Sequence, residues 1–326
     1  MTTPAASASL PALMYLGASD IAACGIGLPE VVAAVRQAFV RLGQRQAAIG
    51  APLHLRLDSG AHFCAKGGAL PIEGVAVIKL FGNVPDNGRR GLPDYNPLLV
   101  LHEVQTGLVL AVMDGAWLTA VRTAALTATA AQVLAPVPAR RLGLIGSGRQ
   151  AHAHYDVLRL QHPLAELTVF SRNGQTAGEL VRRAQADGYG ARACSTPEAA
   201  IEGQDIVVST IPKNMVASTG MLDARRLAPQ AFVSMVDMGF SWQPSSLEAF
   251  DLVVSDEIDP VTRESREQLN HHGPFDADLA EVLRTPPAPR GRAAFIFAGS
   301  GLADAAVAEL IWRRARERGL GTPLRR

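Results

Sequence analysis

The chain has 326 residues, of which 48% are hydrophobic and 19% charged, which is ordinary globular composition with enough length for two domains. Its formal net charge is only +1 and it contains no long run of Lys or Arg, so we expect neither nucleic acid nor an anionic membrane as its main partner. Cys24, Cys64 and Cys194 lie far apart without CxxC spacing, which argues against a structural zinc and a disulfide framework and suits a reducing cytoplasm.

The sequence shows no sign of membrane insertion or export. No apolar run approaches the roughly 20 residues that are needed to cross a bilayer. The N-terminus lacks the basic and long apolar regions of a signal peptide. We therefore expect a soluble cytoplasmic protein without a bound metal.

The first third of the chain predicts a leading helix followed by a mixed, largely antiparallel sheet. Apolar residues recur at helical spacing from Leu28 to Leu42. Gln105-Thr106-Gly107 predicts a hairpin turn between the last two of four β-type runs. These runs, which alternate with Gly and Pro, are residues 54–57, 75–81, 98–104 and 108–113.

The rest of the chain predicts a parallel sheet with helices on both faces. Residues 117–134 are dense in Ala, Leu and Thr, and Pro136 ends this predicted buried helix. A last helix is predicted from Gly301 to Arg318. Between them, apolar strands alternate with helices, as is typical of a parallel α/β sheet. The predicted strands are 142–145, 167–171, 205–210, 232–236 and 252–255, and the predicted helices are 150–160, 177–186 and 197–201.

The clearest functional signal follows the strand at 142–145. The sequence there is Gly146-Ser147-Gly148-Arg149-Gln150-Ala151, a Gly-x-Gly-x-x-Ala turn that opens a helix. Such a turn lets backbone N–H groups approach a pyrophosphate, and the helix N-terminus adds a partial positive charge. We expect residues 146–151 to bind a dinucleotide, because the strand, the helix and the following α/β alternation supply the required context.

The end of the next strand indicates which dinucleotide binds. An NAD site usually has an Asp or Glu here for the ribose 2′-hydroxyl, whereas this chain has Ser171-Arg172-Asn173. A hydroxyl and a guanidinium suit a 2′-phosphate, so we favour NADP(H) over NAD(H). The alternative is that Arg172 faces solvent or stacks on the adenine. Thr210 and Ile211 follow a later strand, and we expect them at the same crevice unless they form a plain strand exit.

Three cations are candidates for binding a substrate carboxylate. They are Arg56, Lys79 within an apolar strand, and Arg122 within the Ala-rich helix. A cation in so apolar a setting should pair with an anion, either a protein carboxylate or a ligand. Asp114, just before the long helix, is a candidate internal partner or a capping residue. The alternative for Lys79 and Arg122 is that they bind no anion, because they lie at a strand edge or extend their charged ends into solvent.

At these residues the chain resembles the ornithine cyclodeaminase/mu-crystallin family. The resemblance rests on Lys79 in its strand, on the glycine turn, and on three further blocks. These are Thr106-Gly107 with Leu110-Ala111-Val112-Met113-Asp114-Gly115, then Leu118-Thr119-Ala120-Val121-Arg122-Thr123-Ala124-Ala125, and the closing Phe297-Ala298-Gly299-Ser300-Gly301-Leu302-Ala303-Asp304.

The resemblance implies a homodimer of two-domain chains. It implies an α+β domain for substrate binding and dimerisation at residues 10–120, completed by the C-terminal helix at 300–326, and a doubly wound Rossmann domain at 121–299. Lys79 and Arg122 would then contact the substrate carboxylate and carry catalysis. Arg56, Ser300 and Gly301 would also bind the substrate. Thr123, Asp237 and Met238 would lie at the cofactor.

One departure bears on the chemistry. Cyclodeaminases of this family carry an Asp in a Gly-Gly-Asp-type turn after the strand that corresponds to 232–236, and here Asp237 stands about two positions early. Because a small displacement can disable a catalytic geometry, we expect hydride transfer rather than cyclodeamination. The leading hypothesis is an NAD(P)H-dependent reductase of a small cyclic or linear 2-imino acid. The alternatives are an ornithine cyclodeaminase with bound NAD and a non-catalytic NADPH-dependent ligand binder.

Overall fold

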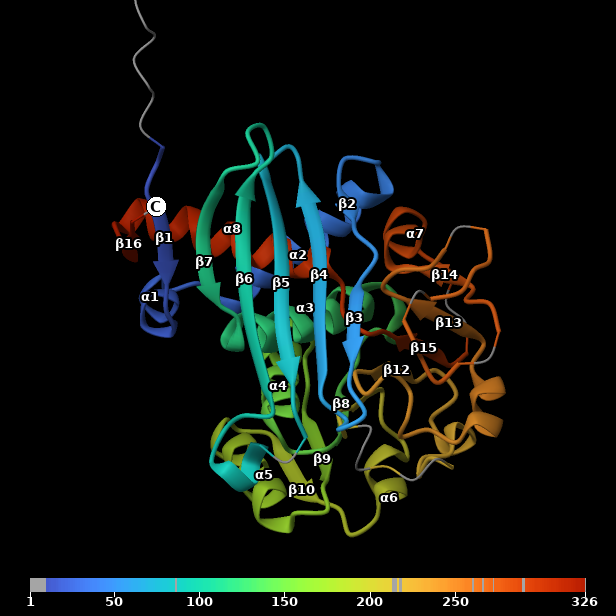
Figure 1. The fold of residues 1–326 in the computed structure, drawn as a ribbon. Helices are drawn as coiled ribbons and strands as arrows, with labels where there is room; N and C mark the ends of the chain where they lie inside the picture. The colour runs from blue at the N-terminus through green and yellow to red at the C-terminus, as the bar shows by residue number, and fades with distance from the viewer. Residues whose placement is uncertain are drawn as a thin grey trace, which may run out of the picture.

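Two eight-stranded sheets, one mixed and one parallel, make up the fold (Figure 1). The computed structural model describes residues 10–85, 87–212, 216, 219–259, 261–265, 267–271, 273–288 and 291–325. None of the helices within these ranges combines the length and the apolarity that crossing a lipid bilayer requires.

The first sheet uses both ends of the chain. Its strand order is β16-β1-β7-β6-β5-β4-β2, with β3 paired to β4, and only β1 and β7 run parallel. The largely antiparallel sheet expected from the sequence is therefore confirmed. The strands are β1 (Leu13–Leu16), β2 (Ala48–Ile49), β3 (Leu53–Arg56), β4 (His62–Leu70), β5 (Val75–Asn83), β6 (Tyr95–Glu103), β7 (Val109–Asp114) and β16 (Thr322–Leu324).

Long helices cover one face of this sheet (Figure 1). The C-terminal helix α8 packs on β4 and β5, and α2 packs against both α3 and α8. The sequence predicted all three long helices, and α8 has the predicted bounds. The helices on this side are α1 (Ala18–Ala23), α2 (Leu28–Gly43), α3 (Ala116–Leu134) and α8 (Gly301–Arg318).

Glycines allow α8 to lie unusually close to β4. A Cβ at Gly68 would come within 2.6 Å of the Leu302 Cα, and a Cβ at Gly301 would come within 2.4 Å of the Gly67 carbonyl oxygen. Only glycine permits such an approach between two backbones. Strand β4 was not predicted from the sequence, since Lys66, Gly67 and Gly68 lower the strand propensity of this segment.

The second sheet is entirely parallel and doubly wound. Its order is β10-β9-β8-β11-β12-β15-β13-β14, so the strand order reverses between β8 and β11. In such sheets ligands bind outside the strand ends at this reversal. The strands are β8 (Arg141–Ile145), β9 (Glu166–Phe170), β10 (Gly190–Ala193), β11 (Ile206–Ser209), β12 (Phe232–Met235), β13 (Leu252–Ser255), β14 (Ala277–Asp278) and β15 (Ala293–Ile296).

The helices around this sheet agree with the predicted alternation. Asn173 and Thr196 cap α5 and α6 by accepting hydrogen bonds from backbone N–H groups. The α/β fold expected from the sequence is confirmed, although short elements such as β10, β14, β15 and α7 were missed. The helices are α4 (Arg149–Gln161), α5 (Gly174–Ala186), α6 (Pro197–Ile201) and α7 (Leu279–Arg284), with 3₁₀ turns η1 (Asn87–Arg90), η3 (Ala224–Arg226) and η4 (Pro244–Ala249).

Helix α3 belongs to the core of both halves. It packs against α2, α8 and β6 on one side and against α4, β12 and β15 on the other. The domain boundary expected between residues 120 and 121 falls inside this unbroken helix. Helix α3 therefore fixes the position of the first sheet relative to the second.

Candidate active site between the two sheets

A cavity of about 550 Å³ lies between the two halves of the chain. It collects side chains from α3, from the glycine turn, from β6 and from the segment after β15. Four residues that the sequence singled out, Arg122, Thr123, Arg149 and Gln150, line it together. The other lining residues are Pro93, Asp94, Tyr95, Ala116, Thr119, Ala120, Val236, Phe297, Ala298 and Gly299.

The glycine turn sits where the strand order of the parallel sheet reverses. Gly146 has φ +107°, and a Cβ there would lie 2.4 Å from Thr210 Oγ1, so the position requires glycine. Its N–H donates to the Phe170 carbonyl at 2.8 Å, which ties the turn to the end of β9. Gly148 caps α4, and no atom lies within 4 Å of where its Cβ would be. The structure thus leaves room beside Gly148 at the start of α4, where a pyrophosphate would approach the backbone.

The remaining residues of the turn divide between the cavity and the interior. Arg149 and Gln150 face the cavity. The Ser147 hydroxyl lies 2.6 Å from Thr176 Oγ1 of α5, and Ala151 is fully buried. Ser147 and Ala151 thus hold α4 in place, while their predicted contacts with the cofactor stay predictions.

The segment expected to select the cofactor lies beside the glycine turn. Ser171 and Arg172 directly follow β9, whose last carbonyl accepts the Gly146 N–H bond. Arg172 is exposed, and within the described part of the chain no carboxylate pairs with it. Asn173 uses its side chain to cap α5, accepting from the Gln175 N–H at 3.0 Å. The segment thus offers a guanidinium and a hydroxyl, with no acidic side chain among residues 171–173.

Thr210 and Ile211 differ in where they point. Thr210 donates from both its backbone N–H and its hydroxyl to the Ile145 carbonyl, at 2.8 and 3.1 Å. Ile211 is 5% exposed and packs in the hydrophobic core beside Trp242. Thr210 therefore supports the glycine turn, and the side chain of Ile211 does not line the cavity.

A buried ion cluster lies behind the cavity wall. Lys79 Nζ is 2.7 and 2.9 Å from the two carboxylate oxygens of Asp304, and Arg122 Nε is 2.9 Å from one of them. All three side chains are almost completely inaccessible to solvent. A cation in an apolar setting was expected to pair with an anion, and the partner is a protein carboxylate, Asp304. Asp114 instead accepts the Ala116 N–H at 2.9 Å at the start of α3.

The two cations of this cluster occupy different positions. Arg122 lines the cavity. A Cβ at Gly299 would come within 2.2 Å of its Nη1, so the guanidinium fits here only because residue 299 is glycine. Lys79 is only 1% exposed and does not line the cavity, so the structure does not bring it to the expected substrate position. Burial, and then the charge of Arg122, lower the pKa of Lys79, while Asp304 opposes the shift.

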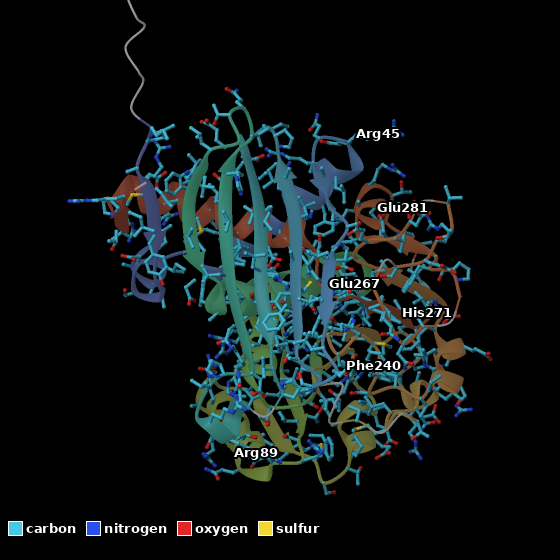
Figure 2. All side chains as sticks on the ribbon, in the orientation of Figure 1. Arg45, Arg89, Phe240, Glu267, His271 and Glu281 are labelled. Atoms are coloured by element: carbon cyan, nitrogen blue, oxygen red, sulfur yellow. The ribbon has the colours of Figure 1, made fainter. Side chains whose placement is uncertain are left out.

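A second ion pair lies directly beside the first. Lys66 on β4 is the register partner of Lys79 on β5, so the two lysine side chains lie next to each other on the same face of the sheet. Lys66 Nζ lies 2.5 Å from Glu267 Oε1 and donates to the Gly299 carbonyl at 3.1 Å. Figure 2 shows Glu267 beside β3, where the two halves of the chain meet. Each lysine thus has its own carboxylate, which reduces the repulsion between them.

Asp237 is enclosed just beyond the cavity wall. Its Oδ1 accepts from the Ser209 hydroxyl at 2.9 Å and from the Gly239 N–H at 3.2 Å. Its Oδ2 has no hydrogen-bond partner among the described residues. Burial raises the pKa of Asp237 to about 6, despite these hydrogen bonds. Met238 adopts φ +59°, and Val236 is the residue of this segment that reaches the cavity.

A family comparison agrees with this architecture. The model of the ornithine cyclodeaminase/mu-crystallin family matches residues 59–316. The chain belongs to this family. A relative described as an uncharacterised cyclodeaminase of Sinorhizobium fredii is 31% identical over 296 residues, covering 84% of this chain and 88% of the relative.

Solved structures of two enzymes have the same fold over nearly the whole chain. A Thermococcus litoralis Δ1-pyrroline-2-carboxylate reductase in complex with NADH and L-proline superposes with a TM-score of 0.84 at 22% identity, covering 95% of this chain and 100% of the other. An archaeal alanine dehydrogenase dimer with bound NAD gives a TM-score of 0.86 at 22% identity, covering 96% and 99%. The family resemblance expected from the sequence motifs is confirmed by the match of the family model to residues 59–316.

Other predicted substrate residues of this family member lie outside the main cavity. Arg56 is exposed and is the register partner of His62. Ser300 caps α8 by accepting the Leu302 N–H at 3.0 Å, and Gly301 lies against the Gly67 carbonyl. Ser300 and Gly301 border a narrow recess with Lys66, and their substrate contacts stay predictions.

Several residues of the site were not assigned a role from the sequence. Asp304 was quoted only within the closing motif, yet an acidic residue among the apolar residues of α8 is itself a signal for a buried partner. Thr119 and Phe297, which line the cavity, were likewise quoted only as members of motif blocks, and Tyr95 belongs to none of these blocks. Glu267 lies in a segment for which the sequence predicted neither a helix nor a strand.

Proposed function

We propose that this protein is an NAD(P)H-dependent reductase of a small 2-imino acid, cyclic or linear, and in reverse an amino-acid dehydrogenase. The observation that carries the proposal is one shared cavity. Arg149 and Gln150 of the glycine turn and Arg122 of α3 line the same space of about 550 Å³. Pockets for small ligands span about 300–1,000 Å³. The names of the similar solved structures, a pyrroline-2-carboxylate reductase and an alanine dehydrogenase, support the same reaction class.

The residues around Gly146 fit a dinucleotide. The open start of α4 suits its pyrophosphate, and Arg149 and Gln150 lead from there into the cavity. Ser171 and Arg172 favour a 2′-phosphate, so we propose NADP(H) as the preferred coenzyme. When bound, the nicotinamide supplies or accepts the hydride.

Arg122 is the group we propose to bind the substrate carboxylate. Two cations share the one carboxylate of Asp304, so the cluster keeps one positive charge when Lys79 is protonated. Arg122 presents this charge at the cavity, and a planar guanidinium suits a carboxylate. Lys79 acts as a positioning residue, because its contact with Asp304 holds the carboxylate against Arg122.

Positioning supplies much of the proposed rate enhancement. An imine that is already protonated at neutral pH needs little further acid catalysis, so holding its carbon near the hydride donor is the main task. Apolar side chains also line the cavity, with Ala120, Val236 and Phe297 among them. These side chains exclude water from the reacting carbon.

We also propose a homodimer through the outer face of the first sheet. The residues of β3 to β6 that face away from α8 are apolar and exposed, and they adjoin across the strands. A contiguous exposed apolar face of this kind marks a protein interface. The residues are Leu53, Leu55, Phe63, Ile78, Leu80 and Leu98.

Oxidation of NADPH and NADH against a panel of imino acids tests the proposal. The panel holds pyrroline-2-carboxylate, piperideine-2-carboxylate, and pyruvate or glyoxylate with amines. Turnover with at least one of them supports a reductase. Release of ammonia from ornithine without net reduction of NAD would instead show a cyclodeaminase. Tight binding of NADPH without turnover of any panel member would indicate a ligand binder.

A further inference from the structure

We propose that His54, His62 and Cys64 form a binding site for a transition-metal ion, with Zn²⁺ as the best match to its donors. The site lies outside the cavity assigned to the substrate and does not depend on the proposed reaction. One ligand atom from each residue, either a ring nitrogen or the thiol sulfur, lies within 4.8 Å of the others. The sequence spacing gave no metal signal, because only the β3–β4 hairpin brings the three together.

The hairpin fixes the three side chains on one face of the sheet. His54 and Cys64 are direct register partners, and His62 precedes Cys64 by two residues on β4. Side chains two apart on a strand share a face, and register partners are neighbours across it. The Leu57 N–H donates to the Ala61 carbonyl at 2.9 Å at the hairpin turn, which holds this register.

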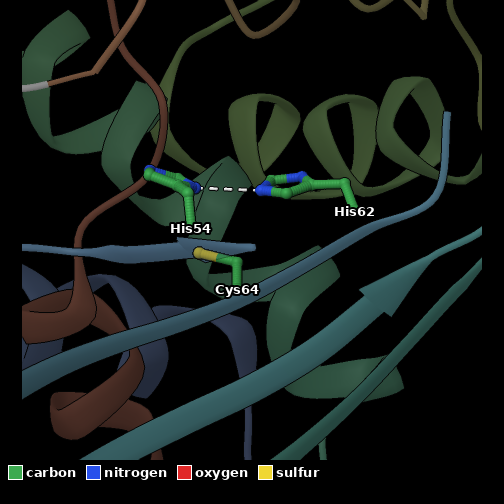
Figure 3. Close-up of side chains that lie close together, drawn as sticks. All are labelled: His54, His62 and Cys64. Carbon is green, nitrogen blue, oxygen red and sulfur yellow. Dashed lines mark hydrogen bonds between the residues drawn. The ribbon is translucent and has the colours of Figure 1, made fainter. Parts of the chain in front are cut away.

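The two imidazoles already point nitrogen to nitrogen. His54 Nδ1 and His62 Nε2 are 2.9 Å apart and share a hydrogen bond, with Cys64 beside them (Figure 3). The other nitrogen of His54, Nε2, lies 3.2 Å from Glu267 Oε2. An N–H at this nitrogen donates to Glu267 and leaves a lone pair on Nδ1. Such a carboxylate behind a histidine is a common way to orient a metal ligand.

The distances suit a small ion after a modest adjustment. Bonds of about 2.0–2.1 Å to nitrogen and 2.3 Å to sulfur in a tetrahedral site place the ligand atoms roughly 3.3–3.6 Å apart. The two nitrogens, 2.9 Å apart, must separate slightly, and the sulfur, which lies within 4.8 Å of both, must approach by at most about 1.2 Å. Three protein ligands leave the fourth position for water or an anion.

Charges of both signs surround the cluster: Glu267 lies next to His54, while the cations Arg56 and Lys66 lie near His62. A metal requires a neutral imidazole and a thiolate, so the Cys64 thiol must give up its proton. Metal binding replaces that proton: the sulfur–hydrogen bond breaks, a sulfur–metal bond forms, and one proton is released. Glu267, paired with Lys66, lies close enough to balance part of the added charge.

Cobalt is a direct probe, because thiolate-bound Co²⁺ absorbs in the near ultraviolet and tetrahedral Co²⁺ absorbs strongly in the visible. The full chain, reduced and stripped of metal with a chelator, is titrated with Co²⁺ and then with Zn²⁺. We expect both bands to saturate at one equivalent per chain and to disappear as Zn²⁺ displaces the cobalt. Absence of a thiolate band at this stoichiometry would overturn the proposal.

Matched variants separate this cluster from other cysteines and histidines. Cys64→Ser should abolish the near-ultraviolet band, and His62→Ala should weaken Co²⁺ binding by at least about tenfold. Cys194→Ser, a half-buried free cysteine elsewhere, should keep both bands. Circular dichroism of each variant checks folding, and His54→Ala serves as a second test if Cys64→Ser does not fold. A band that survives Cys64→Ser, or that disappears with Cys194→Ser, would place the metal elsewhere.

Discussion

Lys79 and Asp304 form a buried ion pair with a 2.7 Å contact, although 225 residues separate them in the sequence. The pair joins β5 of the first sheet to the C-terminal helix α8. The same carboxylate holds Arg122 at the edge of the cavity. The position of the proposed substrate-binding guanidinium therefore depends on the last helix of the chain.

Asp304→Asn tests this dependence. The change leaves two buried cations without the carboxylate, and breaking a buried pair from one side costs about 3–5 kcal/mol. Denaturant unfolding should show a loss of this size in the free energy of unfolding. Glu317→Gln is the control, because Glu317 pairs with arginines on the exposed surface of α8 and should contribute less than about 1 kcal/mol. A wild-type stability for Asp304→Asn would contradict the coupling.

Arg122→Ala tests the carboxylate contact. The variant should lose at least about tenfold in kcat/KM for the imino acid, because the group that binds and orients the carboxylate is gone. The KM for the coenzyme should change little in the same steady-state assay. Arg159→Ala, on α4 away from the cavity, should keep the wild-type value. Unchanged kcat/KM in Arg122→Ala would refute the contact.

Arg172→Asp tests the coenzyme preference. A carboxylate at this position repels a 2′-phosphate and can accept from a 2′-hydroxyl, so the KM for NADPH should rise by at least about tenfold. The KM for NADH should stay the same or fall. Arg182→Asp, at an exposed position on α5, controls for the change in surface charge. An unchanged KM for NADPH would remove the basis for NADP(H).

Asp237→Asn should change how stability depends on pH. Burial raises the pKa of Asp237 from 3.8 to about 6, so the unfolded chain loses this proton at lower pH than the folded chain. The carboxyl therefore lowers the free energy of unfolding progressively as pH rises from about 4 to 6. Above pH 6 the loss is constant, on the order of 2–3 kcal/mol.

The asparagine cannot ionise, so Asp237→Asn should gain stability relative to wild type across that same interval. Denaturant unfolding on both sides of the interval measures the gain, and any constant effect of the amide cancels in the difference. Ser209→Ala is a useful companion, because it removes a donor to Asp237 and should raise the carboxyl pKa further. Parallel pH profiles for wild type and Asp237→Asn would show that this carboxyl keeps its ordinary pKa.

Leu80→Glu tests the proposed interface. Leu80 is 46% exposed on the outer face of β5, where a buried charge would be costly in a dimer. Light scattering during size-exclusion chromatography should give the mass of two chains for wild type and of one chain for the variant. Leu160→Glu is the control, because Leu160 is similarly exposed but lies on α4. A dimer that persists in Leu80→Glu would place the interface elsewhere.

Short-range interactions along the chain specify the local structure of this protein. The strand, the Gly146 turn and the start of α4 follow from short-range rules, because backbone conformation and helix ends depend on neighbouring residues. The alternation of apolar strands with helices likewise specified the parallel sheet. The motif blocks around Lys79, Asp114, Arg122, the glycine turn and Asp304 together indicated the family, which the family model confirms.

Which charged groups meet depends on how the folded chain packs. Lys79 pairs with Asp304, and Lys66 pairs with Glu267, across separations that no periodicity encodes. The Lys79–Asp304 pair exists because α8 packs on β4 and β5, and its close approach to β4 depends on Gly68 and Gly301. A low-polarity interior forces each buried cation to have a partner, but which partner it has is a property of packing.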